Sequence, residues 1–220
     1  MFGLSLNSFI QILIYTLPAI VIALSIHEFA HAFVAYKMGD ITQKERGRIS
    51  LNPFAHVDWT GLLCLLIFQF GWAKPVQVDT RYFKDEKEGL VWSSIAGPVV
   101  NLLAGFIFIF IYFLLVKLNI YTYQSSGIVN YIMELLLMCS LINIGLGIFN
   151  LIPIPPLDGS KVLISVLPDK IYHQILRYEQ YISILLLFVL VLGVLDNPLF
   201  YARTTIFGWY TTLATMILGI

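Results

Sequence analysis

The sequence predicts an all-α polytopic membrane protein with about four to six membrane helices and a short re-entrant, strand-containing segment. Of its 220 residues, 59% are hydrophobic and only 12% are charged, whereas soluble domains carry about 25% charged residues. The apolar residues come in runs long enough to cross a bilayer, and polar loops or prolines separate them. The formal net charge of +0 argues against nucleic acid as a partner. The lipid bilayer is therefore the expected surrounding.

The first half of the chain combines one long apolar run with shorter, irregular pieces. Residues 8–38 are expected to form a single helix longer than a bilayer core requires, and a polar loop over 37–48 follows. The apolar run 62–70 is too short to cross, so we expect a re-entrant or interfacial piece. The start of 48–61 is expected to be strand-like, with an extended or turned backbone near Pro53, and 71–78 is expected to be extended because of its proline and β-branched residues.

The second half of the chain contains two firmer spans, at 91–116 and 128–151. A proline-rich break over 151–162 follows, because a regular helix cannot continue through these prolines. The rest is expected to comprise an amphipathic stretch at 163–178, a span near 180–195, and a segment at 204–220 that crosses again or lies along the interface.

Basic residues are divided unevenly between the loops. If the short apolar run does not cross, the loops 37–48, 74–88 and 152–180 share one side and hold eleven of the thirteen Lys and Arg residues. Only Lys117 and Arg203 fall on the other side. Because basic loops stay in the cytoplasm, that side is expected to be cytoplasmic and the N-terminus external.

Two histidines and a glutamate lie inside the first apolar run, as His27-Glu28-x-x-His31. Ionisable groups at this depth are costly unless they are paired or ligated. At 3.6 residues per turn the two rings lie about 40° apart on one helix face, so both can reach one metal ion. Two imidazoles suit Zn²⁺ and leave room for a third ligand and a water, whose proton Glu28 can take. The alternative is a pair of buried histidines bonded to backbone or to Glu28.

Zinc would need a third protein ligand, and Asp158 in PIPPLDG is favoured. The prolines and Gly159 set its direction at the end of a span, and broken backbone at membrane depth is tolerated only where it lines a cavity or packs in protein. The alternative is that Asp158 caps a helix that begins at the next residues. The less favoured ligand candidates are Glu134, His56, Asp58 and His173.

Asparagine and small residues in the later spans are expected to support the site. Asn101 in AGPVVN would form a supporting or interhelical hydrogen bond, and Asn143 is open to the same interpretation. Gly97 and Pro98 more simply allow a kink and close helix packing. The sequence does not say which groups support the histidine rings.

HEFAH, GWAKPV, AGPVVN and NLIPIPPLDG, in this order, resemble the site-2 protease family of intramembrane zinc metalloproteases over roughly residues 20–165. The resemblance implies one zinc ion per chain, bound by His27, His31 and Asp158. It implies that Glu28 is the catalytic glutamate. It also implies, for residues 1–220, a single transmembrane metalloprotease domain of the minimal kind without PDZ or CBS domains.

The resemblance has two further implications. Asn150 would polarise the scissile carbonyl or bind the oxyanion. The region 48–78 would correspond to the strand-rich re-entrant part of the family, where a substrate adds as a strand. A peptide bond in a membrane helix is shielded, so its cleavage needs a delivered water, a Lewis acid and an unwound substrate.

The expected function is hydrolysis of peptide bonds within or near transmembrane segments of membrane-protein or peptide substrates. The expected location is the cell membrane, with the active site nearer the cytoplasmic side. A metal transporter or metal-binding protein that uses the same histidine pair is the alternative, and a silent zinc scaffold is a third possibility. Transport gives no reason for Glu28 beside the first histidine. The oligomeric state stays open.

Overall fold

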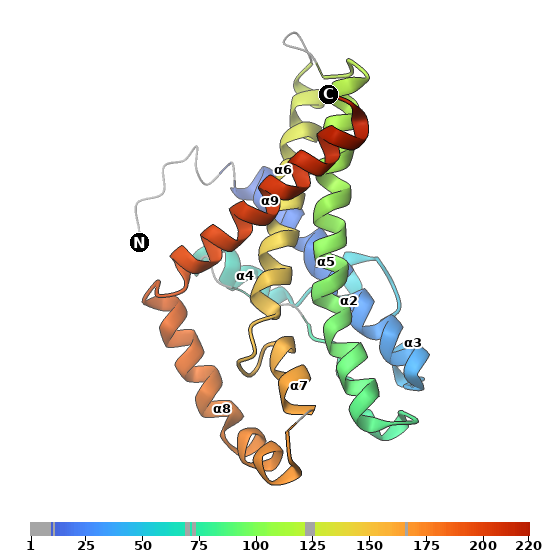
Figure 1. Cartoon of the computed structure of the whole chain (residues 1–220), viewed down its shortest axis with the longest axis vertical. Helices are drawn as coiled ribbons and strands as arrows, with labels where there is room; N and C mark the ends of the chain where they lie inside the picture. The colour runs from blue at the N-terminus through green and yellow to red at the C-terminus, as the bar shows by residue number, and fades with distance from the viewer. Residues whose placement is uncertain (1–9, 11, 69–70, 72–73, 122–125, 166) are drawn as a thin grey trace.

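Three long apolar helices form the centre of the computed structural model (Figure 1). The first begins as a π-helical turn, η1 (Ile12–Thr16), and continues as α2 (Leu17–Met38). The others are α5 (Glu86–Lys117) and α6 (Gly127–Asn150). Each of the three is long and apolar enough to cross a membrane. The structure describes residues 10, 12–68, 71, 74–121, 126–165 and 167–220.

These helices confirm the spans that the sequence predicts at 91–116 and 128–151, and α5 extends further at its N-terminus. There the Asp85 side chain caps the helix by accepting from the Glu88 backbone N–H at 2.9 Å. Within the expected helix over 8–38, the described residues are helical from Ile12 to Met38, while residues 8, 9 and 11 lie outside the described part.

The C-terminal third differs from the expected layout. A single helix, α8 (Asp169–Val191), contains most of the amphipathic stretch expected at 163–178 and most of the span expected near 180–195. It is followed by α9 (Asp196–Leu218) across a bend of 80°, and the two are apolar enough to cross only when taken together. The described part of the chain therefore holds three possible membrane helices, or four with the bent pair, at the lower end of the predicted range.

The segment between α2 and α5 has less strand than the sequence predicts. After the short α3 (Thr42–Glu45), Pro53 begins a 3₁₀ turn, η2 (Pro53–Ala55), which Asn52 caps by accepting from the Phe54 N–H at 3.1 Å. Of the extended and turned backbones that the sequence allows near Pro53, the structure has the turned one, and the strand-like start expected for 48–61 does not form a strand. Among the described residues of this segment, the β-structure is limited to an isolated bridge at Val57.

The short apolar run forms a helix, α4 (Trp59–Phe68), of ten residues. At 1.5 Å per residue it is about 15 Å long, half of a bilayer core, so the expectation that this run does not cross is confirmed. After the residues outside the described part, the Lys74 N–H donates to the His56 carbonyl, in the loop before α4, at 2.8 Å. A second 3₁₀ turn, η3 (Thr80–Tyr82), leads to α5.

Helix α5 packs against α2, α6, α9 and the short α7 (Asp158–Ser165). Small residues allow these contacts. A Cβ added at Gly147 would lie 2.9 Å from the Pro98 carbonyl oxygen, and one at Gly105 would lie 2.7 Å from Cγ1 of Ile144. Close backbone approach at glycine is the usual way in which membrane helices gain packing contacts. Large apolar side chains such as Leu103 and Ile107 are exposed on the outside, as lipid-facing residues are.

The polar connections gather at one end of the long axis. In Figure 1, α3, the start of α5, and α7 with the start of α8 all lie in the lower half, while the end of α5, the start of α6 and the C-terminus lie at the top. The end of α5 at the top is held by Lys117, whose Nζ donates to the Leu218 carbonyl. This arrangement agrees with the uneven division of basic residues that the sequence predicts.

Candidate metal centre

Three buried side chains from α2 and α7 converge on one point. The Nε2 atoms of His27 and His31 lie 2.9 Å apart. Asp158 Oδ2 lies 3.1 Å from the first and 3.0 Å from the second. Helix α7 begins at Asp158, yet this carboxylate is directed to the histidines, and its Oδ1 accepts from Lys161 Nζ at 3.1 Å. The residues that the sequence singled out as ligands are therefore brought together.

In each imidazole ring, the hydrogen bond at Nδ1 determines whether Nε2 carries a proton or can bind a metal ion. His27 Nδ1 lies 2.6 Å from Asn101 Oδ1, and His31 Nδ1 lies 2.6 Å from the Ser93 carbonyl oxygen. Both partners accept hydrogen bonds, so each Nδ1 carries the proton and each Nε2 presents a lone pair. Two lone pairs and a carboxylate oxygen that face one another at about 3 Å repel unless a cation lies between them. The donor set fits Zn²⁺.

Asn101 is oriented by a chain of hydrogen bonds across three helices. Its Nδ2 donates to the Ala23 carbonyl at 3.0 Å and to Asn143 Oδ1 at 2.7 Å. Asn143 Nδ2 in turn donates to the Cys139 carbonyl at 2.8 Å. These donations leave Asn101 Oδ1 facing His27, so the interhelical hydrogen bond predicted for Asn101 is confirmed. The Ser93 contact uses a backbone carbonyl, which leaves no signal in the sequence.

Gly97 allows α5 to lie directly against the two rings. A Cβ at this position would lie 2.4 Å from His31 Nε2 and 2.6 Å from His27 Cε1, closer than atoms can approach. The prediction of close packing at Gly97 is confirmed, and the packed group is the metal-binding face of α2 itself.

Glu28 and Asn150 line the same cavity as the three candidate ligands, with a volume of about 730 Å³ including its open mouth. Glu28 is buried, and its Oε2 accepts from the Val76 N–H at 2.7 Å. Asn150 Nδ2 donates to the Leu146 carbonyl at 3.0 Å, which uses one of its two amide hydrogens. Val76 and Lys161, which sequence reasoning did not single out, also line this cavity.

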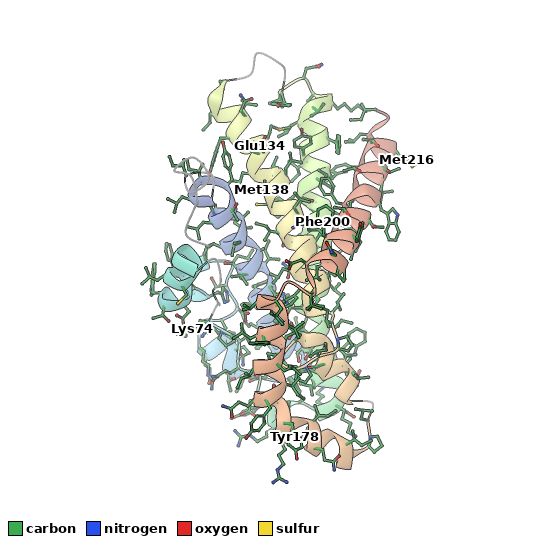
Figure 2. The ribbon with its side chains drawn as sticks, turned by 90° about the vertical axis from the view of Figure 1, so that its left-hand side faces the viewer. Lys74, Glu134, Met138, Tyr178, Phe200 and Met216 are labelled. Carbon is green, nitrogen blue, oxygen red and sulfur yellow. The ribbon has the colours of Figure 1, made fainter. Side chains whose placement is uncertain are left out.

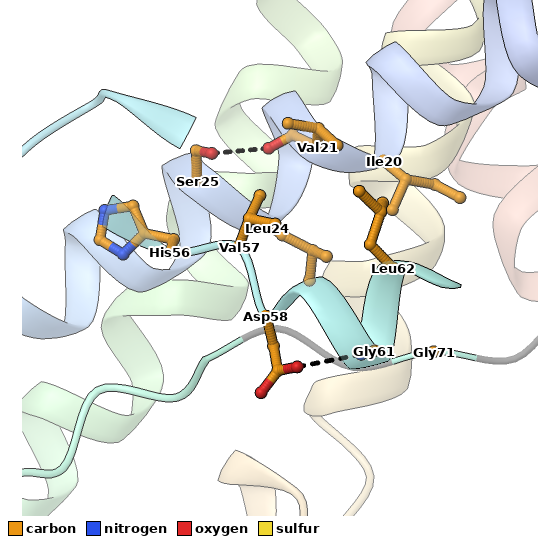
Figure 3. Close-up of a pocket in the computed structure, with 10 residues that line it drawn as sticks. All are labelled: Ile20, Val21, Leu24, Ser25, His56, Val57, Asp58, Gly61, Leu62 and Gly71. Atoms are coloured by element: carbon orange, nitrogen blue, oxygen red, sulfur yellow. Dashed lines mark hydrogen bonds between the residues drawn. The ribbon is translucent and has the colours of Figure 1, made fainter. Parts of the chain in front are cut away.

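Three of the less favoured ligand candidates, Glu134, His56 and Asp58, do not line the cavity of the metal centre. Glu134 is exposed towards the upper end of α6 (Figure 2), far from the end that holds Asn150. His56 and Asp58 line a separate, mainly apolar pocket between α2 and α4 (Figure 3). There His56 Nε2 lies 2.7 Å from the Ser50 carbonyl oxygen, and Asp58 caps α4 by accepting from the Gly61 N–H at 3.0 Å. The side chain of His173 is outside the described part.

Apolar helices that surround a buried three-donor site with an adjacent glutamate define a class, the membrane metalloproteases. Residues 117–193 match the family described as "Peptidase family M50". "Putative zinc metalloprotease YwhC" of Bacillus subtilis is 38% identical, over 81% of this chain and 82% of that protein. The chain belongs to this family, the site-2 proteases, and is a zinc-dependent metallopeptidase of the membrane.

Two other relatives extend the comparison. "Putative zinc metalloprotease Rip2" of Mycolicibacterium smegmatis is 25% identical, over 88% of this chain and 73% of that protein. "Zinc metalloprotease MJ0392" of Methanocaldococcus jannaschii is 30% identical, over 68% of this chain but only 33% of its own length. No solved structure is significantly similar to the chain.

Proposed function

We propose that this membrane zinc metalloprotease cleaves peptide bonds within or near transmembrane segments of membrane-protein or peptide substrates, as a step of regulated intramembrane proteolysis. The observation that carries the proposal is the position of the cavity. It lies at the junction of α2, α5, α6 and α7, and three of these helices, α2, α5 and α6, are long and apolar enough to cross the membrane. A peptide bond that is hydrolysed in this cavity therefore belongs to a substrate chain that has entered the membrane.

We propose that His27, His31 and Asp158 bind one zinc ion. The support is the convergence of three acceptor atoms that the surrounding hydrogen bonds hold in place. Zinc bound there supplies the Lewis acidity that peptide hydrolysis needs, by lowering the pKa of a water and polarising a carbonyl.

We propose that Glu28 takes the proton of the attacking water and passes it to the leaving amine. Its carboxylate is within the cavity and accepts one hydrogen bond, from Val76, so it has acceptor capacity left for a water. Asn150 is the proposed oxyanion donor, because one hydrogen of its amide is not used by Leu146.

Substrate unwinding remains part of the proposal, but the 3₁₀ turn at Pro53–Ala55 argues against pairing along 50–56. Within the non-helical chain 75–78, three residues line the cavity: Pro75, Val76 and Val78. We propose that an unwound substrate lies against this chain, where backbone groups can be satisfied.

Replacement of Glu28 by Gln tests the proposed function. The variant should keep its zinc, because the three donor atoms are unchanged, and should lose cleavage of a membrane-spanning peptide by several orders of magnitude. Zinc is measured by elemental analysis, and cleavage by mass spectrometry in lipid vesicles. The matched control is Glu134→Gln, on an exposed position of α6, which should cleave normally.

Two results would contradict this proposal. Cleavage that persists in the Glu28→Gln protein would exclude Glu28 as the base. Zinc flux across the vesicle membrane that is the same with Glu28 and with Gln, without cleavage by either protein, would indicate transport.

A further inference from the structure

A second polar pocket lies directly beside the catalytic cavity and is strongly basic. Its volume is about 780 Å³ including its open mouth. Three of its lining residues are cationic, and no carboxylate lines it. The lining residues are Gln43, Arg46, Arg48, Lys74, Pro75 and Gln77.

Hydrogen bonds from Arg48 and Gln43 hold the walls of this basic pocket in place. Arg48 Nη1 donates to the Ala55 carbonyl at 2.6 Å, which fixes the guanidinium against the loop. Gln43 is fully buried, and its Nε2 donates to Asp40 Oδ2 and to the Gln77 carbonyl, both at 2.8 Å. The pocket is therefore formed by the fold and is more than a set of mobile surface side chains.

Two of the cations, Arg46 and Lys74, form no close ion pair among the described residues, although Arg46 is near enough to Asp79 to help lower the pKa of that carboxyl. Both cationic side chains are exposed. The nearby carboxylates are engaged: Asp79 pairs with Arg81 at 2.7 Å, and Asp40 is buried among hydrogen-bond donors. Gln43 Oε1, buried in the wall, also lacks a hydrogen-bond partner among the described residues. Like charges around one pocket favour an anionic ligand.

The wall between the two pockets is a single chain. Pro75 lines both of them, Val76 and Val78 line the catalytic cavity, and Lys74 and Gln77 line the basic pocket. The same chain is tied to the catalytic site by the hydrogen bond from Val76 N–H to Glu28 Oε2. Since neighbouring chains lie about 5 Å apart and an extended chain rises about 3.3 Å per residue, a bound peptide crosses this wall within about five residues.

We propose that the basic pocket binds an acidic side chain of the substrate, within about five residues of the cleaved bond, and so selects substrates with a carboxylate next to their membrane segment. This inference rests on the proposed function and adds the chemistry of the substrate. The shared wall favours a substrate residue over the headgroup of an anionic lipid, because only a substrate residue is held in register with Glu28.

The test uses the full chain in vesicles of neutral phosphatidylcholine and pairs of membrane-spanning peptides. Each pair carries Glu or Gln at one position, scanned up to six residues on either side of the cleaved bond. The Glu peptide should have a kcat/KM about threefold to tenfold higher at one position, the scale of a partly exposed charge pair. Arg46→Glu and Lys74→Glu should remove this preference, so that the ratio of kcat/KM for the Glu peptide to that for the Gln peptide falls to about one or below.

The matched control is Lys84→Glu, at an exposed lysine that does not line the basic pocket, which should keep the preference. Equal kcat/KM for Glu and Gln peptides at every position would overturn the inference while the proposed function stands. A dependence on Arg46 and Lys74 that appears only in vesicles with phosphatidylglycerol, equally for both peptides, would also overturn it and indicate a lipid-headgroup site.

A binding measurement separates failure of this inference from failure of the proposed function. Fluorescent Glu and Gln peptides are titrated against the Glu28→Gln protein, which needs no hydrolysis. If the Glu peptide binds more tightly than the Gln peptide, and if Lys74→Glu removes this difference, the basic pocket is supported even where neither peptide is cut. Equal binding of the two peptides would refute it.

Discussion

At the scale of single residues, the groups behind the two imidazoles decide what the imidazoles can bind. Asn101 Oδ1 and the Ser93 carbonyl oxygen accept hydrogen bonds from the two Nδ1–H groups. The Nε2 lone pairs of both rings therefore face Asp158. A histidine pair without such partners could rotate or exchange tautomers, and supporting groups of this kind typically change metal affinity by about 10- to 100-fold.

Replacement of Asn101 by Ala should weaken zinc binding by about 10- to 100-fold, because His27 Nδ1 loses its acceptor. Competition with a chromophoric chelator measures the affinity. Asn143→Ala is the graded comparison: it touches the site only through Asn101, so its effect should be smaller, and the double variant should show coupling. Wild-type affinity in Asn101→Ala would disprove the supporting role.

Gly97→Ala should impair both the metal site and the packing of α5. Its Cβ would overlap His31 Nε2, so α5 or the rings must move, at a cost of about 1–3 kcal/mol. Zinc content and thermal stability in lipid are the measurements. Gly208→Ala in α9, where an added Cβ meets no atom within 4 Å, should retain both. A Gly97→Ala protein with full zinc and stability would contradict the close approach.

At the scale of elements, the chain between α4 and α5 is held by the loop that ends α2. Asp40 accepts from the Asp79 N–H at 3.0 Å and from Gln43 Nε2 at 2.8 Å, and Gln43 binds the Gln77 carbonyl. The same chain contacts Glu28 through Val76. The wall of the catalytic cavity is thus positioned by a buried carboxylate in the loop after α2.

Asp40 predicts a pH dependence of stability. Burial raises the pKa of this carboxyl, but hydrogen bonds from Asp79, Thr42 and Gln43 outweigh burial and hold the pKa below its ordinary value of about 3.9. The carboxylate therefore contributes stability above about pH 4, and this contribution is lost as the pH falls through the lowered pKa of the folded state.

Asp40→Asn should remove this acid-sensitive contribution and lower the stability at neutral pH by about 1–3 kcal/mol, because its amide would face two N–H donors. Thermal melting in bicelles between about pH 3 and pH 7 measures both effects. Glu45→Gln, at an exposed position nearby, should melt like the wild type. Identical pH profiles for Asp40→Asn and the wild type would contradict the prediction.

At the scale of the whole molecule, α5 holds the site together and the basic connections share one end. α5 contacts α2, α6, α7 and α9, so the donors from α2 and α7 meet against a common support. We propose that the end with α3 and the start of α5 is cytoplasmic and that the protein resides in the cell membrane. The division of basic residues supports this orientation.

Cysteine labelling tests this orientation. In a background in which Cys64 and Cys139 are replaced by Ala, an impermeant maleimide should label Lys117→Cys on intact spheroplasts and Lys44→Cys only on inverted vesicles. The uneven division of basic residues predicts that these two positions lie on opposite sides of the membrane, so each is the control for the other. Labelling in the reverse order would contradict a cytoplasmic site.

The sequence predicted the features whose causes are local. Hydrocarbon thickness and run length predict the spans at 91–116 and 128–151, and helical spacing alone places His27 and His31 on one face. The strand-like start expected for 48–61 does not form a strand, and near Pro53 the backbone takes the turned form of the two that the sequence left open, because the Asn52 cap stabilises it. The 80° bend before α9 depends on packing against α5 and α6, which periodicity does not show.

The sequence by itself determined the class of protein, the helix that carries the histidines, and the residues worth testing. Only the tertiary structure decided which groups meet: Asp158 lies 131 residues from His27, and Asn101 lies 74 residues from it. Contacts of this separation depend on how apolar helices pack, and that depends on fits such as Gly97 against the two rings. The spacing of His27 and His31 along one helix follows from the sequence, but the groups that face them, Asp158 and Asn101, are set by helix packing.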